Sequence, residues 1–302
     1  MNNVGIDVGG TKLESVLLAD DGSEIDRRRV ATPVGDYEGV VSSIVGLVKD
    51  VESAFGDVAT IGMGTPGTED RATGLLKHSN SVALNRRPLR HDVAAKLGRA
   101  VAIANDADCL ALSEAMDGAG ADHATVFAMI LGTGVGGGLV VRRRLVTGPN
   151  GLAGEWGHNP LPSPRVDEIP GLACYCGRFG CVETWLSGPS LALDHARHTG
   201  VDATAGDIAA AAAAGDHAAS ATVERYADRL ARGLASVINL VDPDVIVLGG
   251  GVSNIGTLYD RVPELWDRYV FGDSVVTPLV PAVHGDSSGV RGAAYLGLTE
   301  QA

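Results

Sequence analysis

The sequence predicts an α/β fold of two domains, and three observations support this prediction. The chain has 302 residues, which is about twice the length of a common domain. Apolar runs typical of strands alternate along it with segments in which apolar residues recur at helical spacing. A strand, a glycine-rich turn and a second strand occur at 4–18 and again at 124–141, as expected if one domain had been duplicated.

The first domain is expected to begin with a hairpin and to continue as alternating strands and helices. The run Asp20-Asp21-Gly22-Ser23 is typical of a turn between strands. Apolar residues from Val40 to Phe55 recur at helical spacing and predict a helix. The predicted strands are 4–8, 13–18, 24–30, 60–64 and 100–104, and the predicted helices are 40–55, 89–97 and 107–116.

The second half of the chain begins with the repeated hairpin and then becomes helical. Asp242-Pro243 is expected to end a long amphipathic helix. The predicted strands are 124–131, 139–141 and 245–248, and the predicted helices are short ones within 203–221, a long one over 223–238 and a last one over 287–298. Residues 149–181 are rich in Gly, Pro and Cys and predict no regular element, so this segment needs an organiser such as a metal ion.

Composition and charge exclude several classes of protein. Hydrophobic residues make up 45% and charged residues 20% of the chain, which is typical of a globular protein rather than a disordered one. The net charge of −13 makes nucleic acids and anionic membranes poor partners. Residues 1–7 lack the basic and apolar regions of a secretory signal, and glycines interrupt the apolar stretch 126–141. We therefore expect a cytoplasmic protein that neither spans a membrane nor binds nucleic acid.

The first glycine turn, Asp7-Val8-Gly9-Gly10-Thr11-Lys12, has the composition of a phosphate-binding loop. Glycines allow backbone N–H groups to approach a phosphate, and Thr and Lys add a hydroxyl donor and a positive charge. The Asp7 carboxylate is a candidate ligand for Mg²⁺, directly or through water. The structural alternative is a hairpin turn that uses glycine for its positive φ angle.

Two further glycine-rich segments also follow apolar strands. They are Gly132-Thr133-Gly134-Val135-Gly136-Gly137-Gly138 and Gly249-Gly250-Gly251. Each alone is explained by a turn, but three such segments after strands favour nucleotide binding. None of them has the spacing of a Walker A loop or of a Rossmann dinucleotide motif.

Asn105-Asp106 follows a predicted strand and precedes a predicted helix. Ligands of α/β sheets bind at such strand ends. There, an Asp106 carboxylate can accept the proton of a hydroxyl that attacks phosphorus. The structural alternative is that Asp106 caps the helix, and both roles are compatible.

One histidine and three cysteines form a candidate zinc site. His158, Cys174, Cys176 and Cys181 supply four ligands, the number that a structural tetrahedral zinc ion takes. Reduced cysteines without a metal are the alternative, and the fourth cysteine, Cys109, is expected to be a small buried hydrophobe. Glu155 and Glu183 flank the cluster and are candidates to hold the hydroxyls of a sugar, unless they are ordinary surface charges.

These residues together resemble the ROK family of sugar kinases, and within it the bacterial fructokinase/mannokinase type. The resemblance covers essentially the whole chain and rests on these segments: Ile6–Lys12, Gly62–Gly67, Ala104–Ala107, Gly132–Gly138, Gly154–Pro162, Cys174–Thr184, Asp242–Gly251 and His284–Ala294. It implies a two-lobed, actin-like (RNase H-like) ATPase fold with a ligand cleft between the lobes and a zinc-braced loop. The smaller lobe would comprise residues 1–118, with 289–302 returning to it, and the larger one residues 119–288.

The resemblance also implies roles for individual residues. Asp106 would be the catalytic base, and His158 would bind zinc through one ring nitrogen and the sugar through the other. The implied sugar-binding residues are Gly64, Thr65, Asn105, Asp106, Glu155, His158 and Glu183. The implied ATP-binding residues are Asp7, Gly9, Gly10, Thr11, Lys12, Gly132, Thr133, Gly134, Val135 and Gly136, with Gly249, Gly250 and Gly251 near the adenosine.

From this resemblance we expect an ATP- and Mg²⁺-dependent kinase that phosphorylates the 6-hydroxyl of a free hexose. Fructose is the first choice of substrate and mannose the second. The alternatives are a glucokinase or N-acetylglucosamine kinase of the same family, a non-catalytic sugar sensor, and an actin-like filament or chaperone ATPase. A homodimer is a further expectation from the resemblance.

Overall fold

The computed structural model describes residues 2–272 and 274–300, and the chain folds into two compact units. Unit 1 comprises residues 1–124, 138–154 and 283–302. Unit 2 comprises residues 125–137 and 155–282. The C-terminal segment thus belongs to the same unit as the N-terminus, and so does the stretch 138–154.

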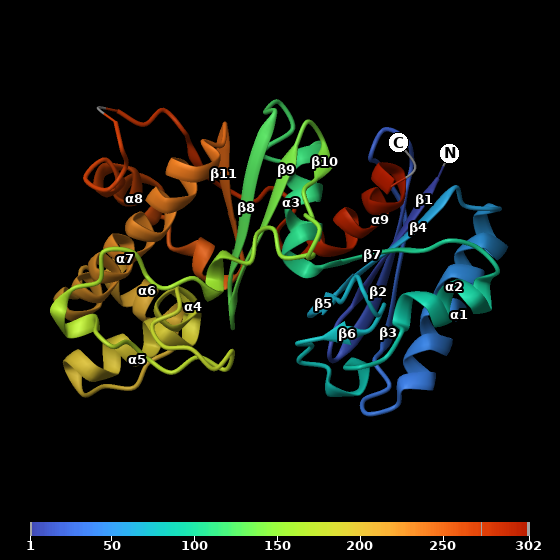
Figure 1. Ribbon diagram of the computed structural model, residues 1–302, viewed down its shortest axis with the longest axis horizontal. Coiled ribbons are helices and arrows are strands. Elements are labelled where there is room, and N and C mark those ends of the chain that lie inside the picture. The colour runs from blue at the N-terminus through green and yellow to red at the C-terminus, as the bar shows by residue number, and fades with distance from the viewer. Residues whose placement is uncertain (1, 273, 301–302) are drawn as a thin grey trace. The chain divides into compact units, whose positions relative to one another are not determined.

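Unit 1 is built on a five-stranded sheet in the order β3-β2-β1-β4-β7 (Figure 1). The strands are β1 (Asn3–Val8), β2 (Lys12–Leu18), β3 (Glu24–Ala31), β4 (Thr60–Thr65) and β7 (Ala102–Asn105), and a separate two-stranded ribbon is formed by β5 (Thr68–Glu69) and β6 (Leu76–Lys77). β1 is antiparallel to β2 and parallel to β4, which is parallel to β7. The register pairs Asp7 with Gly64 and Thr65 with Asn105. These four residues therefore lie together at the carboxyl ends of the parallel strands β1, β4 and β7.

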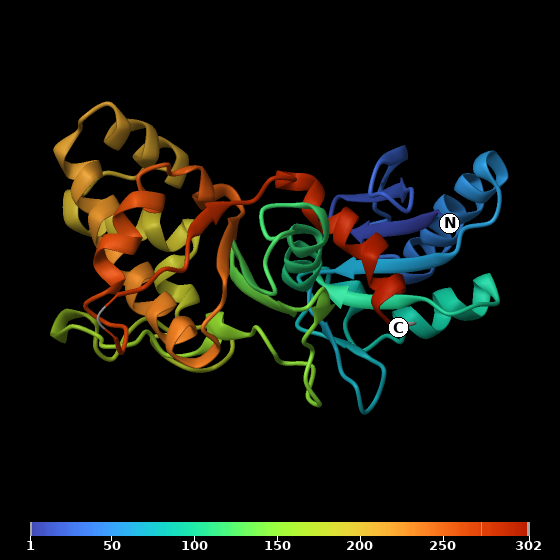
Figure 2. The same ribbon diagram turned by 90° about the horizontal axis from the view of Figure 1, so that it is seen from above.

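Helices cover both faces of this sheet (Figures 1 and 2). They are α1 (Tyr37–Phe55), α2 (Leu89–Leu97), α3 (Asp106–Asp117) and α9 (Ser288–Glu300). Val4, Ile6 and Val8 share one hydrophobic core with α1 and α2. On the other face α9 packs against β1 and β4, where a Cβ at Gly5 would clash with the backbone of α9. Alternation along β1 therefore places branched side chains toward α1 and glycine toward α9.

A second five-stranded sheet has the order β10-β9-β8-β11-β12. Its strands are β8 (Thr125–Leu131), β9 (Val135–Val141), β10 (Arg144–Leu145), β11 (Val245–Gly249) and β12 (Leu279–Pro281). β11 is parallel to β8 and to β12, as β4 is parallel to β1 and to β7. The two sheets therefore have corresponding strand orders, which supports the predicted duplication.

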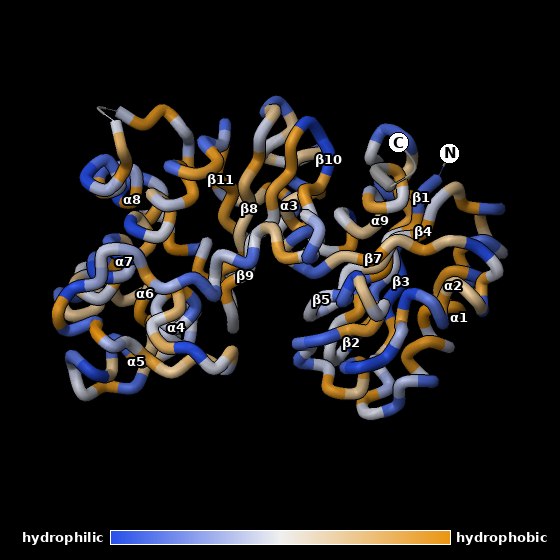
Figure 3. The backbone as a smooth tube through the Cα atoms, viewed as in Figure 1, coloured by the Kyte–Doolittle hydropathy of each residue, from blue (hydrophilic) through white to orange (hydrophobic). Residues whose placement is uncertain are grey.

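The remaining helices belong to unit 2 and form a layer around its longest helix (Figure 1). They are α4 (Glu183–Leu186), α5 (Gly188–Thr199), α6 (Ala205–Ala213), α7 (His217–Val241) and α8 (Leu258–Trp266). Figure 3 shows mainly apolar strands β8 and β9 and alternating polarity along α7, as expected for a helix with one buried face. No described helix combines the length and the apolar character needed to cross a bilayer.

The glycine-rich segment after β8 forms a shorter turn than the sequence predicts. Only residues 132–134 turn, and β9 already begins at Val135. A Cβ at Gly138 would lie 2.7 Å from the Cβ of Ala111 on α3. Glycine is thus required inside this strand because a helix packs directly on it, and the prediction that the strand begins only at residue 139 is wrong.

The irregular segment 149–181 is held to α7 by a buried ionic cluster. Glu168 accepts hydrogen bonds from Arg229 at 2.8 Å and from Arg232 at 2.7 and 2.8 Å. Burial raises the pKa of Glu168, but these hydrogen bonds outweigh it and hold the pKa at about 2. The segment therefore has charged anchors in addition to any metal that it binds.

Candidate functional site

The turn between β1 and β2, which the sequence predicts to bind phosphate, has an exposed backbone. A Cβ at Gly9 would lie 2.6 Å from the carbonyl oxygen of Lys12, so only glycine fits there. Gly10 and Thr11 are exposed. The Lys12 ammonium group donates to Glu14 at 3.1 Å, so its charge is shared with a carboxylate of β2 rather than directed only at the turn.

Asp7 lies at the end of β1 in an environment that disfavours its charge. Burial and then the nearby charge of Asp106 raise its pKa from 3.8 to about 6. A divalent cation beside these two carboxylates would offset both effects. The two residues therefore fit a cation site, in agreement with the expectation for Mg²⁺.

Asn105 and Asp106 occupy the start of α3. The Asn105 side chain accepts the N–H of Asp108 at 2.6 Å and is the N-cap of the helix. Asp106 is the first helical residue, is exposed, and accepts the N–H of Ala107 at 2.9 Å. The suggestion that Asp106 is the N-cap is thus wrong, because Asn105 already fills that position.

Gly64 and Thr65 end β4 beside these residues. A Cβ at Gly64 would lie 3.0 Å from Sγ of Cys109 on α3, which explains the glycine. Thr65 is buried, and its hydroxyl has no hydrogen-bond partner among the described residues. A buried hydroxyl without a partner is costly unless water or a ligand satisfies it.

In unit 2 the glycine turn lies against Glu183. The backbone N–H of Val135 donates to Oε2 of Glu183 at 3.1 Å, and a Cβ at Gly134 would lie 2.8 Å from that same oxygen. The N–H of Gly188, at the start of α5, donates to the carbonyl of Gly132 at 2.8 Å. The glycine turn at 132–136, which is predicted to bind phosphate, therefore lies in contact with Glu183, which is predicted to bind the sugar.

Gly249–Gly251 connect β11 to the next short helical turn. Gly250 has a φ angle of +84°, and a Cβ there would lie 2.6 Å from the carbonyl oxygen of Leu131 at the end of β8. The third glycine-rich segment is thus required by backbone conformation and by close packing.

The four predicted zinc ligands come together in the segment before α4. Their ligand atoms all lie within 4.8 Å of one another. Sγ of Cys176 is 3.6 Å from Sγ of Cys181, and Sγ of Cys174 is 3.6 Å from Nδ1 of His158. Tetrahedral zinc with ligand bonds of about 2.1–2.3 Å separates such atoms by about 3.6–3.8 Å. The donor set and its spacing therefore fit a structural zinc ion.

The loop that carries His158 packs tightly on β9. The indole N–H of Trp156 donates to the carbonyl of Gly136 at 3.2 Å, and a Cβ at Gly157 would clash with the carbonyl oxygen of Val135. Glu155, directly before Trp156, is half-buried at the start of this short helical turn.

Sequence reasoning did not identify Tyr175, which lies between two of the predicted metal ligands. Its hydroxyl is 3.0 Å from Nε2 of His158, the ring nitrogen that the sequence assigned to the sugar. Partial burial and the charge of Glu183 raise the pKa of Tyr175 to about 12, so the phenol stays neutral at physiological pH. The only signal for it was an aromatic residue placed between two closely spaced cysteines.

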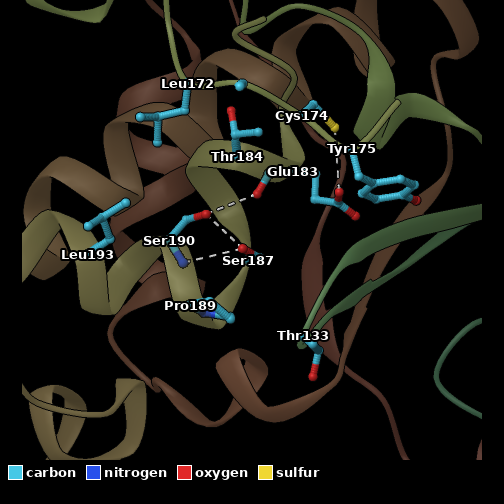
Figure 4. Close-up of a pocket in the computed structure, with 11 residues that line it drawn as sticks. Thr133, Leu172, Cys174, Tyr175, Glu183, Thr184, Ser187, Pro189, Ser190 and Leu193 are labelled. Carbon is cyan, nitrogen blue, oxygen red and sulfur yellow. Dashed lines mark hydrogen bonds between the residues drawn. The ribbon is translucent and has the colours of Figure 1, made fainter. Parts of the chain in front are cut away.

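A cavity of about 340 Å³ opens beside Glu183 and Tyr175 (Figure 4). Thr133 of the glycine turn, Ser187 and Ser190 of the α5 cap, and apolar residues of the metal-binding segment line it. Within unit 2, the cavity is therefore lined both by Thr133, which is predicted to bind the nucleotide, and by Glu183, which is predicted to bind the sugar.

Comparison with known proteins assigns the chain to a family. The ROK family model matches residues 3–300, and the chain belongs to the ROK family. It is 41% identical over 298 residues to the N-acetyl-D-glucosamine kinase of Vibrio cholerae, covering 97% of this chain and 99% of that protein.

Solved ROK structures share its fold. The ROK hexokinase of Thermus thermophilus is 31% identical with a TM-score of 0.88, and the match covers 100% of this chain and 99% of that one. A ROK glucokinase of Streptomyces griseus, solved with glucose and AMPPNP, is 30% identical with a TM-score of 0.79 over 100% of both chains. The predicted family and actin-like α/β fold are confirmed.

The comparisons also correct the predicted substrate. They support a sugar kinase, that is, a phosphotransferase, but the prediction of fructose with mannose second is wrong. Relatives that are 38–41% identical over nearly the whole chain are N-acetyl-D-glucosamine kinases. The error has a physical reason: the glycine turns, the aspartates and the candidate metal ligands are expected to serve phosphoryl transfer and loop order, and these expected roles do not depend on the substituent at C2 of the sugar.

Proposed function

We propose that the protein is an ATP-dependent N-acetyl-D-glucosamine kinase that phosphorylates the 6-hydroxyl of the free sugar. The observation that carries this proposal is the 41% identity to the Vibrio cholerae enzyme over 97% of the chain. The candidate residues of each unit are of the types that phosphoryl-transfer chemistry requires.

Asp106 is proposed as the general base. It lies at the end of a parallel strand with an exposed carboxylate, where it can accept the proton of the 6-hydroxyl as that oxygen attacks the γ-phosphorus. Its carboxylate accepts a hydrogen bond from the Ala107 N–H, which orients it at the start of α3.

Asp7 is proposed to hold Mg²⁺, directly or through water. The ion supplies charge neutralisation at the phosphates when bound. The backbone of Gly9–Lys12 and of Gly132–Gly136 is proposed to donate N–H groups to phosphate oxygens. In the second turn the N–H groups of Gly132 and Val135 already donate, to the Gly134 carbonyl and to Glu183, so its other amides would have to do so. Gly249–Gly251 is proposed to lie near the adenosine.

The residues proposed to hold the sugar are those that the family resemblance implies. They are Gly64, Thr65, Asn105, Asp106, Glu155, His158 and Glu183. His158, Cys174, Cys176 and Cys181 would hold a zinc ion that orders the loop carrying the sugar-binding residues. The two-lobe division and a homodimer stay predictions.

A coupled assay of ADP release with a panel of sugars tests this proposal. The panel contains N-acetylglucosamine, N-acetylmannosamine, glucose, mannose and fructose at equal concentrations with ATP and Mg²⁺. We expect the highest kcat/KM with N-acetylglucosamine. Highest kcat/KM with a sugar that lacks the acetamido group, or ADP release that is independent of sugar, would contradict the proposal.

A further inference from the structure

Two hydrogen bonds fasten the glycine turn after β8 to the segment around α4 and α5. The backbone N–H of Val135 donates to Oε2 of Glu183 at 3.1 Å. The carbonyl oxygen of Gly132 accepts the N–H of Gly188 at 2.8 Å. The amides between these two points therefore depend on both hydrogen bonds for their positions.

The Glu183 carboxylate also packs directly on this turn. A Cβ at Gly134 would lie 2.8 Å from Oε2 of Glu183, so glycine is needed there because the carboxylate leaves no room for a side chain. A carboxylate beside the turn is unfavourable for a bound phosphate, since like charges repel. Any favourable contribution of Glu183 to nucleotide binding must therefore come from the position that it gives to the backbone.

Glu183 is itself held at the junction of two helices. It is the first residue of α4, and its carbonyl oxygen accepts the N–H of Ser187 at 3.1 Å and the hydroxyl of Ser190 at 3.2 Å. Ser187 is the N-cap of α5, and its side chain accepts the N–H of Ser190. The Glu183 side chain therefore starts from a backbone that both helices fix in place.

The other carboxylate oxygen of Glu183 contacts the candidate zinc cluster. Sγ of Cys174 lies 3.8 Å from Oε1 of Glu183, and Figure 4 marks this contact with a dashed line. Cys181, another of the candidate zinc ligands, precedes Glu183 by two positions in the chain. One carboxylate thus contacts a candidate metal ligand through Oε1 and the glycine turn through Oε2.

From these contacts we propose that Glu183 positions the phosphate-binding turn, and that the candidate zinc cluster affects nucleotide binding through it. This inference rests on the proposed function, which assigns ATP phosphates to the turn, and it gives Glu183 a task in addition to holding the sugar. An ionised carboxylate has lone pairs for several hydrogen bonds, so the two tasks are compatible. Glu183 is a positioning residue in this role, because it acts on the nucleotide through the backbone of the turn.

Binding of the ATP analogue AMPPNP in the absence of sugar tests the inference, because no sugar contact contributes to it. Calorimetry with AMPPNP and Mg²⁺ should give a dissociation constant about tenfold higher for Glu183→Ala than for the wild type, as for one lost hydrogen bond to a charged group. Glu183→Gln keeps an acceptor oxygen and should stay within about threefold of the wild type. Asp167→Ala is the control, since it removes an exposed carboxylate of the same unit, and it should bind AMPPNP as the wild type does.

The competing explanations give different results in this experiment. If only the charge of Glu183 mattered, both of its variants would bind AMPPNP more tightly than the wild type. If Glu183 served only the sugar, neither variant would change AMPPNP binding. Either result, or an equal loss in both variants, would overturn the inference. The proposed function fails separately, when the wild type does not phosphorylate N-acetylglucosamine with ATP.

A second measurement uses the unmodified protein and does not depend on how a variant folds. Zinc is removed with a chelator, its loss is checked by elemental analysis, and circular dichroism checks that the protein remains folded. We expect the metal-free protein to bind AMPPNP about threefold more weakly, and the amide of Val135 to exchange faster with deuterium, because Glu183 holds that amide less firmly. If either value stays unchanged, the proposed link from the cluster to the turn is wrong.

Discussion

At the scale of single residues, Asp106 is the residue proposed to take part directly in the chemistry. Its carboxylate is exposed, belongs to the first turn of α3 and already accepts one backbone N–H. The proposed base is therefore held by its own helix, while Asn105 performs the capping that would otherwise occupy it.

Asp106→Asn should lower kcat by about two to four orders of magnitude, because an amide cannot accept the proton of the 6-hydroxyl. Binding of the sugar, measured by calorimetry, should change little. The exposed Asp122 in the loop after α3 provides the control variant Asp122→Asn, which should retain wild-type turnover. Wild-type turnover in Asp106→Asn would rule out this residue as the base.

Asp7 makes the ligand-free protein sensitive to pH. Burial and Asp106 raise its pKa from 3.8 to about 6, so the folded state binds this proton more tightly than the unfolded state. Stability from this group is therefore greatest below about pH 4 and is lost as the pH rises through about 6.

Asp7→Asn should remove this dependence. In buffer without divalent cations or nucleotide, the variant should be more stable than the wild type at pH 7, by up to about 3 kcal/mol, and nearly equal to it at pH 4. Urea unfolding at several pH values measures the difference. The variant Asp20→Asn, in the exposed turn before β3, should keep the wild-type pH profile; a similar change there, or none in Asp7→Asn, would contradict the explanation.

At the scale of elements, the segment between β10 and α4 shows where sequence reasoning succeeded and where it failed. The composition of the segment predicted the metal ligands, because ligand type and number are visible in the sequence. Its second anchor was not visible, since Glu168 contacts Arg229 and Arg232 from a helix more than sixty positions away. The strand β9 was shortened in the prediction because local propensity disfavours glycine, whereas packing on α3 requires it.

Loss of a metal ligand should loosen this element. Cys176→Ser should lower the zinc content from one per chain and lower the melting temperature, and it should raise KM for the sugar, because the same segment carries Glu155 and His158. Elemental analysis and thermal unfolding measure these effects.

Cys109→Ala is the matched control, because Cys109 is buried on α3 outside the cluster. It should retain the zinc. Full activity in purified wild-type protein that contains no zinc would contradict the assignment of the cluster.

At the scale of the whole molecule, the predicted order of strands and helices was largely correct. The repeated hairpin predicted a duplicated domain, and the corresponding strand orders of the two sheets agree with a duplication. The prediction missed the 12-residue helix α5. It also missed short or interrupted elements: β12 has three residues, and α8 contains Pro263. Their apolar patterns are too brief to be distinguished from loops.

The substrate could not be predicted from the shared motifs for a related reason. Residues that bind phosphates and order the metal loop occur in a recognisable sequence pattern. Selectivity for one sugar depends on the shape of a cavity, and one such cavity is lined by Thr133 together with Glu183 and α5, about fifty positions further along the chain. Such a cavity appears only when the chain is folded.

The most direct test of the central claim identifies the product. The protein is incubated with N-acetylglucosamine, ATP and Mg²⁺, and the sugar product is analysed by ³¹P and ¹H NMR. We predict one sugar phosphate per ADP, with phosphorus coupled to the two protons on C6. Phosphate on any other oxygen of the sugar, or ADP formed without a sugar phosphate, would contradict the account.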